Sequence, residues 1–282
     1  MGEDAIVAHP GAQKFKFFEK IYPKLATKKS VGTFSDVNLE TLLDIKPDIV
    51  FAGVTSLATN ERIEALRIPV FTMGIGKHTL PTLLQEFKQV GTLVNKEEKA
   101  KELISFWNEA IEYIEKVVPK DENRVRVLYA NGSNQISSES KGWWGDVFIT
   151  QAGGINVAHD IKIKGDISAE ILLELDPDII ILSNNLSYQK TPQSIKSNPF
   201  YKNLKAVKNN QVYVAPVGGF WWDRPSPEAI FGILWLSKIL YPQQTNEIDL
   251  FAKTSLFFQR FYNYNLTKEE YETFFASTKE LR

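Results

Sequence analysis

The sequence predicts an α/β fold in which two similar lobes are joined by one long helix. The main observation is an internal repeat: residues 36–53 (DVNLETLLDIKPDIVFAG) and residues 166–183 (DISAEILLELDPDIIILS) share seven identities at a separation of 130 positions. Each copy contains a polar helix cap, an amphipathic helix, a Pro-Asp break and a β-branched strand. Two such Rossmann-like lobes enclose one ligand cleft between them.

The N-terminal lobe is expected over residues 1–95. Short β-branched runs at residues 6–8, 49–52 and 70–73 predict its strands, and the first repeat supplies a helix between them. Because the lobe opens directly on the short strand at residues 6–8, we expect it to lack its first strand and helix, together with any export signal.

The connection between the lobes, residues 96–119, is predicted to be a single helix. Apolar residues recur at spacings of three and four over residues 97–118, and Pro119 follows the pattern. About 22 residues at 1.5 Å each give a helix of roughly 33 Å, which is long enough to cross between domains. A helix anchored in both lobes resists hinge bending, so we expect only small movements on ligand binding.

The C-terminal lobe is expected over residues 120–282. Runs at residues 125–130, 179–182 and 212–215 predict its strands. The segment from Pro227 onward is aromatic-rich, and we expect it to form terminal helices that pack against the core.

Composition excludes several classes of function. Thirty-three basic and 34 acidic residues leave a net charge of −1, which gives no electrostatic reason to expect binding to nucleic acid or to a membrane surface. The absence of cysteine excludes thiol catalysis, thiolate metal sites and disulfides. No apolar run reaches the roughly 18 residues needed to span a bilayer, and the first ten residues lack the pattern of a signal peptide.

The loops after the predicted strands, where ligands of α/β sheets bind, are rich in aromatic residues. Two tryptophan pairs, Trp143-Trp144 and Trp221-Trp222, lie in glycine-flanked loops, and Tyr188 lies in the loop after the predicted strand at residues 179–182. We list all five as ligand-binding candidates, and within each tryptophan pair we expect one ring to pack in the core. A cleft of this kind suits a large flat or apolar-faced ligand better than it suits catalysis.

Two basic residues of these loops are candidates for contacting ligand oxygens. Arg224 follows the second tryptophan pair, where it either pairs with Asp223 or Glu228 or offers a forked donor to an anionic ligand. Lys77 follows a predicted strand and is the second candidate.

The histidines leave little scope for a metal site built by the protein alone. His9 and His78 each follow a predicted strand and so could face one cleft, whereas we expect His159 at the surface. Without cysteine or a carboxylate cluster, no complete metal cage can be drawn, and we expect no intrinsic cofactor. His78 or His9 could still complete the coordination of a metal that is already chelated, and we also count His9 among the ligand-binding candidates.

Glu40 and Glu170 occupy equivalent positions near the helix starts of the two repeats. The helix dipole favours a carboxylate there, which is a sufficient structural reason for both. The repeat also places them on matched surfaces of two lobes, so they can serve as paired docking residues.

Together these features resemble the helical-backbone class (class III) of substrate-binding proteins of ABC importers, which handle ferric siderophores, haem, cobalamin and related metal chelates. The motifs that carry the resemblance are NLETLLDIKPDIV, SAEILLELDPDII, AGGINVA and GGFWWDRPSPEAIFGILWLSKILYP, with the long helix between the lobes. The resemblance implies a rigid inter-lobe helix, a shallow cleft and no catalysis. It also implies that Glu40 and Glu170 dock on basic residues of a permease dimer.

We therefore expect a monomeric binding protein at the periplasmic or extracellular face of the cytoplasmic membrane. It would contact the membrane only through the permease, or through an anchor that this sequence does not include. Its ligand is expected to be a metal chelate, with a ferric siderophore as first choice. The alternatives are haem, cobalamin or a small nickel or cobalt chelate that takes His78 or His9 as axial ligand. The alternative of another class is a chelatase-like or nucleotide-dependent enzyme on a related two-lobed fold. Against it, the sequence shows no nucleophile–base pair and no phosphate-binding loop.

Overall fold

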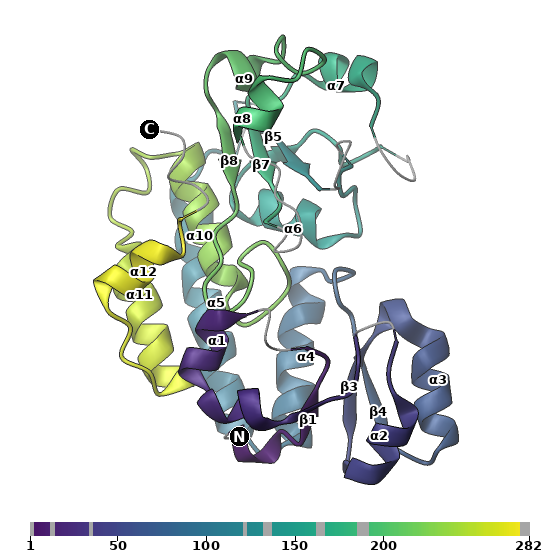
Figure 1. Ribbon diagram of the computed structural model, residues 1–282. Coiled ribbons are helices and arrows are strands. Elements are labelled where there is room, and N and C mark those ends of the chain that lie inside the picture. Colours follow the sequence, from purple (N-terminus) through teal and green to yellow (C-terminus); the bar gives the residue numbers. More distant parts are fainter. Residues whose placement is uncertain are drawn as a thin grey trace.

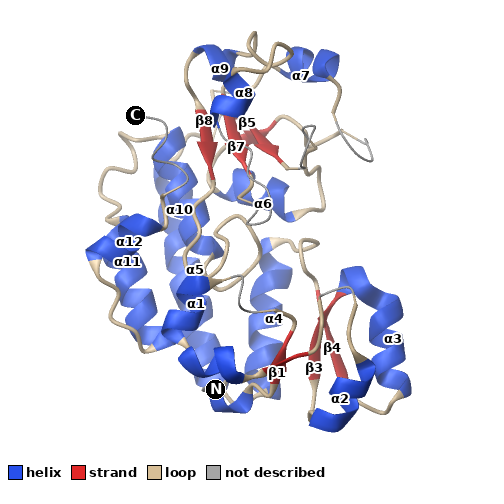
Figure 2. Ribbon diagram, viewed as in Figure 1, coloured by secondary structure: helices blue, strands red, loops and turns tan. Residues whose placement is uncertain are grey.

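Two α/β lobes lie one above the other beside a column of helices (Figure 1). The computed structural model describes residues 3–11, 15–33, 36–120, 123–131, 137–161, 167–184 and 192–276. Figure 2 shows strands in both lobes and helices around them, which is the predicted α/β fold class. Among the described residues, no helix combines the length and the apolar character that a bilayer crossing requires.

The N-terminal lobe contains two separate pairs of parallel strands. β1 (Ala8–His9) pairs with β2 (Lys29–Ser30), and β3 (Val50–Gly53) pairs with β4 (Val70–Met73). The helices of this part are η1 (Glu3–Ala5), α1 (Lys16–Ile21), η3 (Pro23–Thr27), α2 (Leu39–Ile45), η4 (Val54–Ser56), α3 (Leu57–Ala65) and α4 (Leu80–Leu93). The lobe has a small core of its own, formed by Val31, Leu42, Ile63 and Ile68.

The long helix predicted over residues 97–118 is α5 (Glu97–Val117). It packs against α4 on one side and against the helices of the C-terminal lobe on the other (Figure 1). Trp107 lies at the middle of this contact, where its ring is fully buried and its indole Nε1 donates to the Pro227 carbonyl at 3.2 Å. The helix is therefore packed into a core that also contains C-terminal residues.

The C-terminal lobe contains one parallel sheet in the order β6-β5-β7-β8. Its strands are β5 (Arg126–Ala130), β6 (Ile155–Asn156), β7 (Ile179–Leu182) and β8 (Val212–Val214). Its helices are α6 (Trp144–Gln151), α7 (Ala169–Leu175), α8 (Pro192–Lys196), α9 (Lys205–Lys208), α10 (Ala229–Leu240), α11 (Leu250–Phe257), the π-helix η5 (Phe258–Tyr262) and α12 (Lys268–Thr273). β7, whose residues are all buried, contributes apolar side chains to a core on each face of the sheet.

The sequence repeat has the same local structure in both lobes. α2 and α7 are each seven residues long and begin after Asn38 and Ser168, whose side chains accept a hydrogen bond from the helix backbone. They end at Lys46 and Asp176, which adopt the left-handed conformation with φ of 51° and 30°. A parallel strand follows in each case, so the predicted helix-to-strand unit is confirmed in both copies.

Candidate functional site

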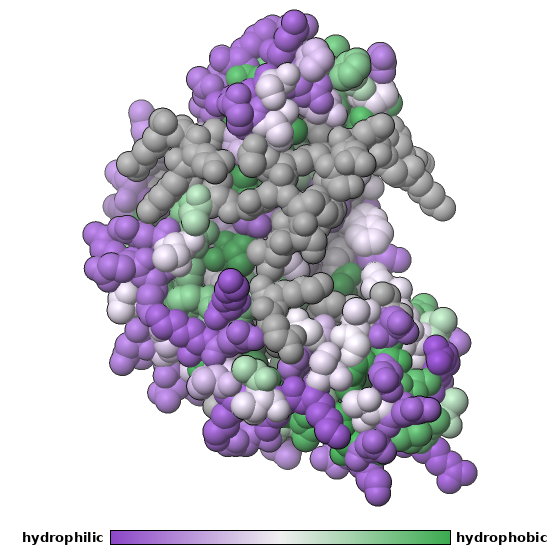
Figure 3. Space-filling view, viewed as in Figure 1, coloured by the Kyte–Doolittle hydropathy of each residue, from purple (hydrophilic) through white to green (hydrophobic). Residues whose placement is uncertain are grey.

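The loops at the carboxyl ends of the strands meet where the two lobes face each other. Figure 3 shows a hollow in the right-hand side of the molecule at this level. The loop after β4 touches the start of α6, because the Trp144 backbone N–H donates to the Gly76 carbonyl at 2.7 Å. The two lobes are thus in direct contact beside the candidate ligand-binding residues.

Lys77 and Trp143 form one part of the site. The Lys77 ammonium lies 5.3 Å from the centroid of the Trp143 ring, a cation–π contact between the lobes. Trp143 is 38% exposed and precedes the first residue of α6. Gly76 packs on the same ring, because a side-chain carbon at this position would lie 3.6 Å from it. The pair therefore offers ligand an aromatic edge and a positive charge.

Arg224 forms the centre of the second part. It donates from Nη1 to the Asp223 carboxylate at 3.1 Å and from Nη2 to the Ser183 hydroxyl at 2.7 Å, and it also contacts the Tyr129 hydroxyl. Its guanidinium carbon lies 5.7 Å from the centroid of the Trp221 ring. About a quarter of the side chain remains exposed, with relative accessibility 26%. The guanidinium is fixed in place while part of it still faces solvent.

Electrostatics keep this guanidinium charged. Burial alone would lower the pKa of Arg224, but the Asp223 carboxylate and the neighbouring Tyr129 and Glu139 raise it above its ordinary value. Burial raises the pKa of Glu139, and its carboxylate accepts the Gly145 backbone N–H at 2.6 Å. Gly145 is required here, because a side-chain carbon would lie within 3 Å of both Tyr129 and Glu139. These contacts connect the start of α6 to Arg224 and the residues around it, Tyr129, Ser183 and Asp223.

The two tryptophan pairs divide as expected, with one ring of each pair in the core. Trp144 and Trp222 are fully buried and pack among core rings, so the prediction that they contact ligand is wrong. Trp143 and Trp221 are the partly exposed members. The Trp221 ring also stands edge-on to Phe15 from the N-terminal lobe, with centroids 4.6 Å apart.

Of the two acidic partners expected for Arg224, Asp223 pairs with it and Glu228 does not. Its buried carboxylate accepts the Trp222 indole N–H at 3.2 Å, the Gly219 backbone N–H at 3.1 Å and the Tyr262 hydroxyl at 2.9 Å. Burial raises the pKa of Glu228 to about 7, although these hydrogen bonds lower it. Glu228 therefore anchors the loop that presents Trp221 and Arg224.

His9 and His78 are buried inside the N-terminal lobe, whereas the His159 side chain is 39% exposed. His78 is 3% exposed and its Nε2 lies 3.0 Å from the Glu86 carboxylate, which also accepts the Gly74 backbone N–H. His9 is buried, and its Nδ1 accepts the Gly11 backbone N–H at 3.0 Å. His159 contacts the Asp146 carboxylate. Within the described ranges, no group of three or more potential metal ligands occurs.

Glu40 and Glu170 are exposed in the first turns of α2 and α7. One turn further along, Leu43 and Leu173 are also matched, and each is 44% exposed. Residues three apart on a helix lie on one face, so each lobe presents a carboxylate beside a leucine.

Several residues of the site were not singled out from the sequence. Tyr129, Ser183 and Glu139 contact or surround Arg224, and Phe15 contacts Trp221. Ser183 does follow a predicted strand, which was a usable signal. Tyr129 lies inside β5, and the sequence alone does not distinguish it from a tyrosine that only packs in the core. Tyr188 lies outside the described residues.

Comparison with known proteins supplies the family context. The sequence model described as "Periplasmic binding protein" matches residues 2–217. The molybdate-binding protein MolA of Haemophilus influenzae is 29% identical over 274 residues, which are 88% of this chain and 76% of that protein. The Fe(3+)-citrate-binding protein YfmC of Bacillus subtilis is 31% identical over 187 residues, which are 66% of this chain and 59% of that protein.

A solved structure resembles nearly the whole chain. The periplasmic solute binding protein of Veillonella parvula superimposes with a TM-score of 0.82 at 29% sequence identity. The match covers 98% of this chain and 86% of that chain. These relatives are binding proteins rather than enzymes.

Proposed function

This chain belongs to the periplasmic binding protein family, as a substrate-binding protein of an ABC importer, and we propose that its ligand is a small anionic metal chelate, with a ferric siderophore as first candidate. In this role it is a binding protein that carries its ligand to a permease. It has no catalytic function.

The observation that carries this proposal is the arrangement of Arg224 on Trp221. The bonds to Asp223, Tyr129 and Ser183 use three of the five N–H donors of a guanidinium. The remaining donors can meet the carboxylate, hydroxamate or catecholate oxygens of a chelate. The exposed parts of the Trp221 and Trp143 rings can cover its apolar faces, and Lys77 adds a second positive charge.

The alternative ligands that need an axial histidine fit this geometry less well. His78 and His9 are buried, and the Nε2 of His78 faces Glu86. Haem, cobalamin or a nickel or cobalt chelate would reach His78 only after that contact was broken. Replacing His78 should therefore have little effect on ligand affinity if the ferric siderophore is the ligand.

A metal oxyanion is a second candidate, and the similarity to MolA over 88% of the chain favours it. A small tetrahedral oxyanion would use the donors of Arg224 and have little need of the aromatic rings. Replacing Trp143 should then leave binding unchanged, whereas a large chelate would lose affinity.

We further propose that Glu40 and Glu170 dock on the permease, one in each lobe, with Leu43 and Leu173 as apolar neighbours. Their equivalent positions suit a two-fold partner. The monomeric protein would act at the periplasmic or extracellular face of the membrane. α5, packed into both lobes, would limit their relative movement.

The test is native mass spectrometry with metal analysis of protein mixed separately with ferric siderophores, ferric citrate, haem, cobalamin, nickel–histidine and molybdate. A bound ferric chelate that is lost in Arg224→Ala supports the proposal. Arg260→Ala is the matched control, because Arg260 also stacks on an aromatic ring, 5.8 Å from the Phe261 centroid, away from the site. Binding only of haem, cobalamin or nickel would contradict the proposal, and binding only of molybdate would favour the second candidate.

A further inference from the structure

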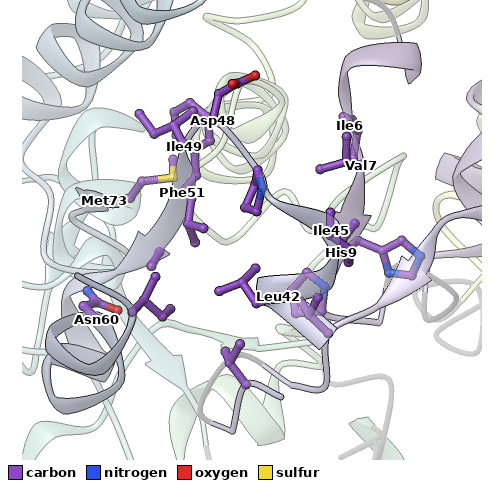
Figure 4. A pocket seen from close by; sticks show the side chains of 18 of the residues that line it. Ile6, Val7, His9, Leu42, Ile45, Asp48, Ile49, Phe51, Asn60 and Met73 are labelled. Atoms are coloured by element: carbon purple, nitrogen blue, oxygen red, sulfur yellow. The ribbon is translucent and has the colours of Figure 1, made fainter. Parts of the chain in front are cut away.

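The turn that follows β4 presents Lys77 to the other lobe. β4 ends at Met73, which lines an apolar cavity between β1 and β3 (Figure 4). From there the chain makes a turn from Gly74 to Lys77, which the Lys77 backbone N–H closes by donating to the Gly74 carbonyl at 3.1 Å. The place of the Lys77 ammonium, 5.3 Å from the centroid of the Trp143 ring, therefore depends on what holds this turn.

The backbone of the turn is strained. Ile75 has φ of 24° and Gly76 has φ of 75°, so both central residues lie in the region of positive φ. A β-branched residue rarely adopts positive φ, and such a conformation persists only where the surrounding structure fixes it. Ile75 packs against Gly53, yet it is 39% exposed, so this contact covers only part of it. The turn thus needs anchors outside its own residues.

Glu86 of α4 contacts the turn at both of its ends. Its Oε2 accepts the Gly74 backbone N–H at 2.8 Å and lies 3.0 Å from Nε2 of His78, the residue directly after Lys77. An ionised carboxylate only accepts hydrogen bonds, so His78 is the donor. Within the described residues, Nδ1 of His78 has no hydrogen-bond partner, which leaves Glu86 as the polar anchor of the ring.

On its far side the turn is attached to the C-terminal lobe. The Gly76 carbonyl accepts the Trp144 backbone N–H at 2.7 Å, and Gly76 also packs on the Trp143 ring. On the near side, α4, which carries Glu86, packs against α5. A continuous path thus leads from a packed helix, through Glu86 and the turn, to the start of α6.

We propose that Glu86 is a positioning residue of the ligand site, which fixes the strained turn and so places Lys77 over Trp143. This role rests on the proposed function, in which Lys77 and Trp143 contact the ligand. Glu86 is only 8% exposed, and burying a carboxylate costs free energy that an apolar side chain of similar size avoids. Its two contacts lie at the two ends of the turn, on either side of the strained residues. The carboxylate is thus placed where it determines the shape of the turn.

The first test needs no ligand. Glu86→Leu replaces the carboxylate by an apolar side chain of similar size, and single-residue hydrogen exchange is compared in the variant and the parent. We expect the Trp144 amide, whose acceptor is Gly76 in the turn, to exchange about tenfold faster in the variant. The Gly145 amide is the internal control, because its acceptor is Glu139 of its own lobe, and it should not change. Unchanged exchange at Trp144 would overturn the proposal.

Two further variants separate the turn from the rest of α4. In Glu86→Gln the side-chain oxygen can still accept both hydrogen bonds, because both end on one oxygen in the parent, so the Trp144 amide should exchange at close to the parent rate. Thr82→Ala breaks the capping box at the start of α4 without removing a contact of the turn. Equal acceleration at Trp144 in Thr82→Ala and Glu86→Leu would mean that Glu86 only stabilises its helix, and would refute the proposal. Circular dichroism verifies folding, and Glu86→Met, unbranched like glutamate, replaces Glu86→Leu if that variant does not fold.

The second test uses ferric citrate as the probe, titrated by isothermal calorimetry into the parent, Glu86→Leu, Lys77→Ala and the double variant. Each single variant should weaken binding about threefold or more, the scale of a partly exposed charge pair. Because Glu86 acts through Lys77, Glu86→Leu should have little further effect in the Lys77→Ala background. A full loss in both backgrounds would contradict the proposal. Ferric citrate that fails to bind, or that binds equally to Arg224→Ala, would count against the proposed function alone, because hydrogen exchange still decides the role of Glu86.

Discussion

Nη2 of Arg224 lies 2.7 Å from the hydroxyl oxygen of Ser183, which directly follows β7. This bond fixes a guanidinium from the loop after β8 against the carboxyl end of the neighbouring strand. It places the charge where ligands of parallel sheets bind.

The first prediction concerns this pair. Arg224→Lys removes the planar fork and the contact with Trp221, so we expect ligand affinity to fall about tenfold or more, the scale of one charge-assisted hydrogen bond. Ser183→Ala should have a smaller effect in the same direction. Isothermal titration calorimetry measures both, and unchanged affinity in Arg224→Lys would exclude the guanidinium from the ligand site.

The second prediction separates the two members of each tryptophan pair. Trp143→Ala and Trp221→Ala should weaken chelate binding and remove most of the ligand-induced fluorescence quenching, with little loss of stability. Trp144→Ala and Trp222→Ala delete buried rings and should cost about 3–5 kcal/mol in the free energy of unfolding. Chemical denaturation and fluorescence titration of the four variants provide the comparison. Quenching that persists in the Trp143/Trp221 double variant would place the ligand elsewhere.

The third prediction concerns Glu228 and pH. Burial raises its pKa from 4.5 to about 7, so the folded protein holds a proton that the unfolded chain has already lost in this range. The resulting stabilisation is complete below the unfolded value and is lost as the pH rises through the folded value. The melting temperature of the parent should therefore fall between about pH 5 and pH 8, and less so in Glu228→Gln.

Glutamine is a suitable replacement, because its oxygen can accept from Gly219 and Trp222 while its amide group donates to the Tyr262 hydroxyl. Burial also raises the pKa of Glu139, so part of the slope should remain in the variant. Parallel curves for parent and variant would mean that Glu228 does not titrate in this range.

The fourth prediction concerns docking. Glu40→Ala and Glu170→Ala should leave ligand affinity and folding unchanged, because exposed substitutions usually change stability by less than about 0.5 kcal/mol. Each should reduce transport by the reconstituted importer, and the double variant more so. Leu43→Ala with Leu173→Ala should also reduce transport. Leu256→Ala, at a leucine that is 51% exposed elsewhere on the surface, should not. Normal transport by the double glutamate variant would show that these carboxylates do not dock on the permease and serve only to stabilise the helix starts.

The fifth prediction concerns α5. A helix packed into both lobes should limit closure, so small-angle scattering profiles with and without ligand should nearly superimpose. A clear decrease in the radius of gyration on ligand binding would contradict a rigid connection.

The site was less predictable than the fold, and the histidines show why. His78 follows β4 as predicted, whereas His9 is the last residue of β1 rather than the residue after a strand at 6–8. Both side chains are buried in the lobe, and His78 meets Glu86, eight residues further on in α4. Arg224 was assigned two possible acidic partners from the sequence, and the structure gives it Asp223, while Glu228 meets Trp222 and Tyr262. A side chain's position in the sequence determines which loop carries it but not the direction in which that loop turns it.

The sequence by itself determined the two repeats, the extent of α5 within one residue and the split of each tryptophan pair into a buried and a partly exposed ring. These features depend on hydrogen bonds and side-chain periods that span only a few neighbouring residues. The tertiary structure alone decided which tryptophan of each pair is buried, which groups surround Arg224, and that β1 and β3 stand apart across a cavity. Burial and strand pairing depend on elements that are distant in the chain, and their contacts leave no local period in the sequence.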